Sequence, residues 1–150
     1  MAVTVSGLFY PTWADILDTT QLAIDLDLET HKVAMFTNTI TPNFSTDTAY
    51  GTGTYGSNEV SGTGYSAGGT ALTGTAVSES PTGTLMWDAT DPSWSGSTIA
   101  SARCALIYAD ALAGNNAICL INFGADYSTT AGTFTIQFAS GGILTIDLTP

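Results

Sequence analysis

Alternation of apolar and polar residues is the main feature of the chain, and it is clearest near the N-terminus. From Leu22 to Leu28, aliphatic residues occupy every second position, and mostly acidic residues lie between them. Period-two alternation is typical of a half-buried β-strand. The pattern therefore predicts a strand over 22–29, a turn at Thr30-His31 and a returning strand over 32–37, so that the segment forms a hairpin.

The same alternation returns in the second half of the chain. Turn signals rich in Gly, Pro, Asn and Ser separate the apolar stretches. Short strands that follow each other at intervals of about 8–15 residues favour an all-β fold, either an antiparallel β-sandwich or a barrel-like domain. The expected strands are 70–78, 82–87, 98–108, 117–123, 132–138 and 143–148.

Helical periodicity is confined to the N-terminal region. Residues 12–18 are expected to form one or two helical turns, with Thr12 as the N-cap and Asp15 in the first turn. Because a helix of this length is not stable alone, it must pack on the sheet or on a neighbouring subunit. The chain therefore divides into an N-terminal arm with a short helix, residues 1–20, and a single β domain, residues 21–150.

A long stretch with little regular structure, residues 39–69, interrupts the strands. It is rich in Thr, Asn, Asp and Gly, and loops of this length inside a compact domain are often functional. Tyr50, Tyr55 and Tyr65 are spread through it. We expect this surface loop to wrap across the domain and to contact a partner through these three tyrosines.

Glycines gather at the end of this loop, in Gly62-Thr63-Gly64 and Gly68-Gly69. A phosphate-binding loop would need a lysine and a following helix, and the sequence offers neither. We interpret these glycines as positions where the backbone needs a positive φ or where another backbone approaches closely.

Charge excludes several kinds of partner. Thirteen carboxylates face two cationic side chains, Lys32 and Arg103, which gives a formal net charge of −11. Nucleic acids and anionic membrane surfaces are bound through clustered Lys and Arg, so neither is expected as a partner. The polarity comes instead from 26 Thr, 13 Ser and 16 Gly, and β-branched Thr is well suited to strands.

No residue pattern predicts catalysis, a metal or a cofactor. His31 is the only histidine, and it falls in an expected solvated turn with no nucleophile elbow elsewhere in the chain. Asp25, Asp27 and Glu29 alternate along the expected strand and do not converge as calcium ligands do. We expect them to form a solvated face, with Lys32 paired to Glu29. A hydrolase that uses two carboxylates in one cleft remains an alternative.

Two tryptophans and two cysteines each allow two interpretations. Trp87 and Trp94 either close the end of the core or stack on a sugar ring. Cys104 and Cys119 are best explained as small buried apolar residues. They lie on adjacent expected strands, so the register of those strands decides whether they share a face.

The run Asn58-Glu59-Val60-Ser61-Gly62-Thr63-Gly64-Tyr65 is the most specific of several segments with a family resemblance. These segments resemble a group of small structural proteins from the virions of tailed bacteriophages, and the resemblance covers roughly residues 23–146. The other similar segments are 27–38, 41–50, 105–110 and 121–124. Members of the group resemble capsid decoration (cement) proteins, although some are called minor tail proteins. The resemblance implies no catalytic residues.

This resemblance implies a virion structural protein on the outer capsid surface that binds the major capsid protein and forms a homo-oligomer, with a trimer as the simplest guess. The alternative is a minor tail or fibre component that attaches to the host and stacks a sugar on a tryptophan. We expect the N-terminal arm to dock on the shell or on a neighbour, and residues 1–13 to be dispensable for folding. The expected arm contacts are Val3, Val5, Leu8, Phe9, Tyr10 and Trp13.

Overall fold

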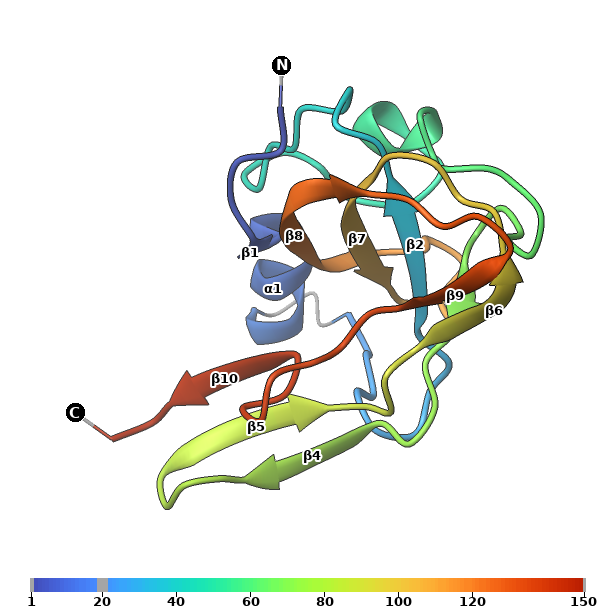
Figure 1. Ribbon diagram of the computed structural model, residues 1–150. Coiled ribbons are helices and arrows are strands. Elements are labelled where there is room, and N and C mark those ends of the chain that lie inside the picture. Colours follow the sequence, from blue (N-terminus) through green and yellow to red (C-terminus); the bar gives the residue numbers. More distant parts are fainter. Residues whose placement is uncertain (1, 19–21, 150) are drawn as a thin grey trace.

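A five-stranded antiparallel sheet forms the centre of the molecule (Figure 1). The computed structural model describes residues 2–18 and 22–149. The strand order is β1-β8-β7-β2-β3. In chain order these strands are β1 (Gly7–Leu8), β2 (Lys32–Phe36), β3 (Thr70–Ala71), β7 (Ala102–Tyr108) and β8 (Ala117–Tyr127).

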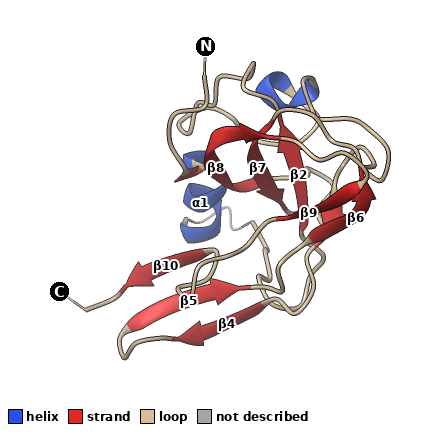
Figure 2. Ribbon diagram, viewed as in Figure 1, coloured by secondary structure: helices blue, strands red, loops and turns tan. Residues whose placement is uncertain are grey.

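Two smaller sheets complete the fold. One has three strands in the order β10-β5-β4 and the other pairs β6 with β9. Their bounds are β4 (Ala76–Glu79), β5 (Thr84–Asp88), β6 (Ser93–Ser97), β9 (Gly132–Thr135) and β10 (Leu144–Asp147). Helical structure in the described residues consists of α1 (Tyr10–Leu17) and a 3-10 turn at Gly53–Gly56 (Figure 2). The expected all-β, sandwich-like fold is therefore confirmed.

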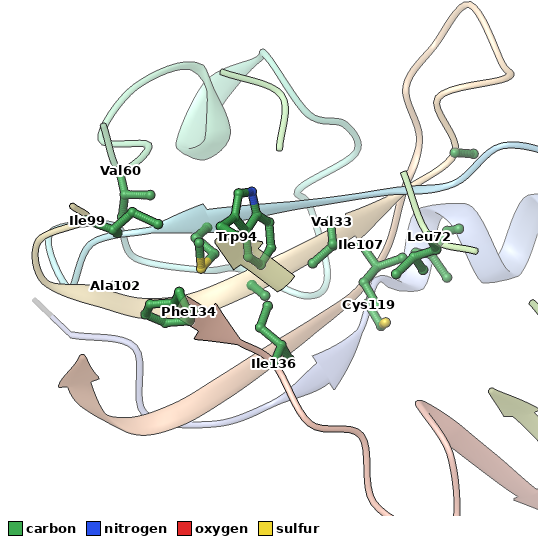
Figure 3. Packing of buried hydrophobic residues seen from close by; sticks show 14 of the residues in the cluster. Val33, Val60, Leu72, Trp94, Ile99, Ala102, Ile107, Cys119, Phe134 and Ile136 are labelled. Carbon is green, nitrogen blue, oxygen red and sulfur yellow. The ribbon is translucent and has the colours of Figure 1, made fainter. Parts of the chain in front are cut away.

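The middle strands of the central sheet, β2 and β7, are buried on both faces, which explains their nearly continuous apolar sequences. Val33 and Ile107 belong to one buried cluster, which also contains residues of the smaller sheets such as Phe134 (Figure 3). Ala34 and Leu106, the next residues along each strand, belong to a second cluster under the long loop. Successive side chains of a strand point to opposite faces, so a strand covered on both sides needs apolar residues throughout.

The expected hairpin over 22–37 is correct only in its second strand. β2 forms as expected, but residues 22–29 form turns and irregular structure instead of a strand. Asp25 Oδ1 accepts the backbone N–H groups of Asp27 and Leu28 at 3.3 and 3.2 Å. Such local bonds to an aspartate compete with strand pairing. The carboxylates of this segment therefore do not form a strand face.

His31 and Lys32 also differ from expectation. His31 is fully buried instead of lying in a solvated turn, and its Nε2 donates to the backbone oxygen of Asp25 at 2.8 Å. Its ring meets the Trp87 ring edge-on at 5.5 Å. Lys32 pairs with Asp110 at 3.1 Å instead of with Glu29. Residues 22–29 do not pair with β2, so the hairpin that would have placed His31 in a turn and Lys32 beside Glu29 does not form.

The N-terminal segment, expected as an arm, packs here as part of the domain. β1 pairs with the edge of β8, and the side chains of Val3 and Phe9 are fully buried. α1 begins at Tyr10 with Phe9 as its N-cap, so Thr12 lies inside the helix, where its hydroxyl donates to Ala117 O at 2.6 Å. The expectation that residues 1–13 are dispensable for folding is therefore wrong, because their deletion would remove the core side chains of Val3 and Phe9.

Most strands of the second half form where they were expected, with shifted ends. The expected strand 70–78 is divided into β3 and β4, and Gly74 between them has a φ of +61°. β6 was not foreseen, because Asp91-Pro92-Ser93 resembles a turn and the strand itself consists mainly of Ser and Gly. These two errors arise where small residues carry little periodic signal.

The register of β7 and β8 answers the question about the cysteines. Cys104 lies opposite Asn122, and Cys119 lies opposite Ile107. The two cysteines belong to different buried clusters on opposite faces of the sheet, and both are free thiols. Burial raises the pKa of each thiol to about 12. Both thiols are therefore protonated at neutral pH, as expected for small buried apolar residues.

Candidate interaction surfaces

The three-stranded sheet projects away from the central sheet (Figure 1). One of its faces is mainly apolar, with the exposed Glu79, opposite Leu85, as the charged residue on that face. Val77 lies opposite Trp87, and Ile146 lies opposite Leu85, so these side chains share one face. At the end of this face nearest the central sheet, Trp87 is buried in the first core cluster. Towards the tip, Leu85 and Ile146 are only partly buried and Val77 is 40% exposed.

We call this area the projecting surface, and it consists of Val77, Leu85, Ile146 and the following Leu148. Leu148 is 68% exposed. Both outer strands, β4 and β10, have an edge that no described strand pairs with. Exposed apolar side chains beside unpaired strand edges are typical of surfaces that bind another protein. The sequence shows alternating apolar residues over 143–148. The exposure of their side chains depends on the position of the three-stranded sheet, which the sequence does not show.

The first part of the long loop covers the second face of the central sheet, its later part packs on the first cluster, and Glu59 joins the two parts. The Tyr50 hydroxyl donates to Glu59 Oε2 at 2.8 Å, and the Tyr65 hydroxyl donates to Oε1 at 2.7 Å. The Gly68 N–H donates to Oε1 at 2.8 Å. Tyr65 also accepts the backbone N–H of Met35 in β2 at 2.9 Å. One carboxylate therefore joins three points of the loop and, through Tyr65, the central sheet.

The loop tyrosines expected to contact a partner are largely internal. Tyr55 is 2% exposed and meets the rings of Phe9 and Phe36 edge-on. Tyr50 stacks on Tyr108 at 4.5 Å. Burial and the neighbouring Glu59 raise the pKa of Tyr50 to about 12, so its hydroxyl stays protonated as the donor. In this conformation the tyrosines fix the loop to the domain and leave little ring surface for a partner.

The glycines at the end of the loop have the roles predicted for them. Gly62, Gly64, Gly68 and Gly69 all have positive φ. A Cβ on Gly69 would lie 1.8 Å from the backbone oxygen of Val33, and the loop therefore approaches β2 more closely than any other residue would allow.

The expected contacts of the N-terminal segment fall into two groups. Val5, Leu8 and Tyr10 are exposed, and Tyr10 is the most open at 69%. Phe9 is buried, and Trp13 is partly buried with its Nε1 donating to Ile118 O at 3.0 Å. Only the first three side chains are therefore available to a partner while the segment is docked.

The two tryptophans belong to the core. Trp87 is fully buried and its Nε1 donates to Leu26 O at 2.8 Å, while Trp94 packs between Tyr65 and Phe134. The interpretation as core residues is confirmed, and neither ring is open for a sugar to stack on.

Acidic side chains greatly outnumber basic ones in this chain, which carries a formal net charge of −11. The two cationic side chains are both engaged, Lys32 with Asp110 and Arg103 with Asp126. Arg103 also donates to Val3 O at 3.1 Å, which ties the N-terminal segment to β7. Among residues 2–18 and 22–149, His, Cys, Asp and Glu side chains form no group of three that could hold a metal ion. Within the same ranges, no helix combines the length and the apolar character needed to cross a membrane.

Comparison with known proteins identifies no relative of this chain. No family model, no curated protein and no solved structure matches the chain.

Proposed function

We propose that this protein is a structural component of a tailed-bacteriophage virion, a decoration protein that binds the major capsid protein on the outside of the shell. Two kinds of evidence support the proposal. The sequence segments 27–38, 41–50 and 58–69 resemble small virion proteins, and the fold offers a projecting apolar surface for a protein partner. The proposal assigns the protein no catalytic role.

The most specific resembling segment has a clear structural purpose in this fold. The run 58–65 contains both Glu59 and Tyr65, which hold the long loop against β2. Gly62 belongs to the same run, and a Cβ there would lie 1.8 Å from Thr98 O. The motif therefore specifies a rigid loop, and a rigid domain suits a protein that clamps neighbouring subunits without changing shape.

The projecting surface is the observation that carries the proposal. It combines exposed aliphatic side chains with two unpaired strand edges, and it lies at the end of the molecule farthest from the long loop (Figure 1). A protein that binds only the assembled shell stabilises it by mass action. Each binding site contributes a stabilising free energy of RT ln(1 + [L]/Kd), where [L] is the concentration of free decoration protein. We include a homo-oligomer, with a trimer as the simplest guess, in the proposal.

A charge placed on this surface tests the proposal. Val77→Glu is expected to weaken binding to undecorated shells by about tenfold or more, since it puts a carboxylate into an apolar contact. The matched control is Ser78→Glu, because the next side chain of β4 points to the opposite face and is also exposed. Co-sedimentation with shells assembled from the major capsid protein measures both variants. Equal binding by the two variants, or no binding by the unaltered protein, would contradict the proposal.

The alternative, a tail or fibre component, relied on a tryptophan that stacks on a sugar. Since Trp87 and Trp94 are both buried, no observation in the structure favours this alternative.

A further inference from the structure

A groove runs between β8 and β9, where the two strands lie next to each other without pairing. Two adjoining depressions of about 460 and 410 Å³ form it, and Ile121 and Gln137 line both. Phe123 and Phe134 lie in its floor with ring centroids 6.2 Å apart. Figure 3 shows Phe134 on β9 as part of the core cluster, so the groove opens directly onto the apolar interior.

One wall of the groove is an unpaired strand edge. The Ile136 N–H donates to Pro92 O at 3.0 Å, and the Phe138 N–H donates to Asp91 Oδ1 at 2.8 Å, so both groups point towards β6. Backbone groups of alternate residues in an antiparallel pair point to opposite edges. The backbone groups of Thr133, Thr135 and Gln137 therefore point into the groove.

On the opposite wall, side chains of β8 and of the N-terminal segment occupy the backbone donors of Asn122 and Gly124. The Asn122 N–H donates to Ser6 Oγ, and the Gly124 N–H donates to Asn122 Oδ1, both at 2.9 Å. Side chains that satisfy an edge in this way prevent another strand from pairing there. Of the two strands that border the groove, β9 is the one that offers open backbone donors.

We propose that the groove binds an extended peptide segment, which adds one strand to the outer edge of β9. Main-chain hydrogen bonds to Thr133 and Thr135 would hold the segment, and its alternate side chains would lie on Phe123 and Phe134. The proposal rests on the proposed function, because it takes the segment to be part of the major capsid protein.

Charge indicates which kind of segment fits. All side chains that line the two depressions are uncharged, whereas the chain as a whole carries −11. Two carboxylates lie close to the groove: Asp126 is next to the lining residue Tyr127, and Asp91 accepts the backbone N–H of Phe138, which lines the second depression. A second copy seated in this groove would bring its own net charge of −11, and like charges across an interface disfavour binding, so the contact of the proposed homo-oligomer is not placed here. The occupant is therefore an apolar segment with neutral or basic flanks from a different protein.

Amide hydrogen exchange on the full-length protein tests this inference. When undecorated shells made of the major capsid protein are added, the amides of Thr133, Thr135 and Gln137 are expected to exchange at least about tenfold more slowly. Thr135→Pro is expected to weaken shell binding by about tenfold, because proline removes the N–H that points into the groove but none that pairs with β6. Thr135→Val is the matched control, since it keeps that N–H, and it should bind normally.

The outcomes separate the two proposals. Shell binding without slower exchange at β9, and with normal binding by Thr135→Pro, would overturn the peptide site but leave the proposed function intact. Absence of shell binding would overturn both. Binding of a cell-wall oligosaccharide that is lost with Tyr127→Ala but kept with Thr135→Pro would make the groove a carbohydrate site and overturn the inference. The exchange measurement uses the unaltered protein, so the test does not depend on the folding of a variant.

Discussion

Gly69→Ala is expected to lower the free energy of unfolding by about 4 kcal/mol, because a Cβ at this position has no room. It would lie 1.8 Å from Val33 O and 2.8 Å from Ala34 Cα, so β2 or the loop would have to move. The φ of +72° adds strain for any residue with a side chain. Urea denaturation followed by tryptophan fluorescence measures the change.

Gly53→Ala is the matched control for this variant. Gly53 lies in the same loop with a φ of +51°, but nothing lies within 4 Å of a Cβ built there. It is expected to lose only about 1 kcal/mol, the cost of the backbone conformation alone. If the two variants lost the same stability, the close approach of the loop to β2 would not be what makes Gly69 necessary.

Glu59→Ala is expected to lower the free energy of unfolding by about 3 kcal/mol. The substitution removes a carboxylate that accepts hydrogen bonds from Tyr50, Tyr65 and Gly68, and bonds to a charged acceptor are the strong ones. Without it the loop loses the group that joins its parts. Amide exchange is also expected to rise across residues 50–68, which thermal denaturation alone would not reveal.

Glu79→Ala provides the comparison, because Glu79 is exposed and accepts one hydrogen bond, from the Gly83 N–H. Its loss is expected to cost less than about 1 kcal/mol. Glu59→Gln should lie between the two, since an amide oxygen accepts hydrogen bonds but carries no charge. A stability for Glu59→Ala equal to that of Glu79→Ala would show that the carboxylate does not hold the loop.

The sequence predicted the fold where the periodic signal agreed with long-range packing. β2 and β7 are apolar apart from Lys32 and Arg103, and with the first four residues of β8 they form the buried centre of the sheet. The segment 22–29 has the cleanest alternation of all, yet Asp25 turns the backbone through local hydrogen bonds. Alternation indicates which side chains would share a face of a strand. It does not indicate whether a partner strand is present.

The candidate surfaces were harder to foresee than the strands. Exposed apolar residues such as Val77 resemble core residues in a sequence, because only the projection of the three-stranded sheet leaves them uncovered. Tyr55 was expected on the surface, since a tyrosine in a polar loop has the composition of a binding residue. Its burial depends on contacts with Phe9 and Phe36, which are distant in the sequence. Glycine positions, by contrast, were predicted correctly from local chemistry alone.

A cryo-EM map of the virion that contains this protein tests the central proposal most directly. The account predicts density for this fold on the outside of the shell, in a number of copies that follows the number of capsomers, with the projecting surface turned towards the major capsid protein. Density for a few copies confined to the tail, or density only inside the shell, would contradict it.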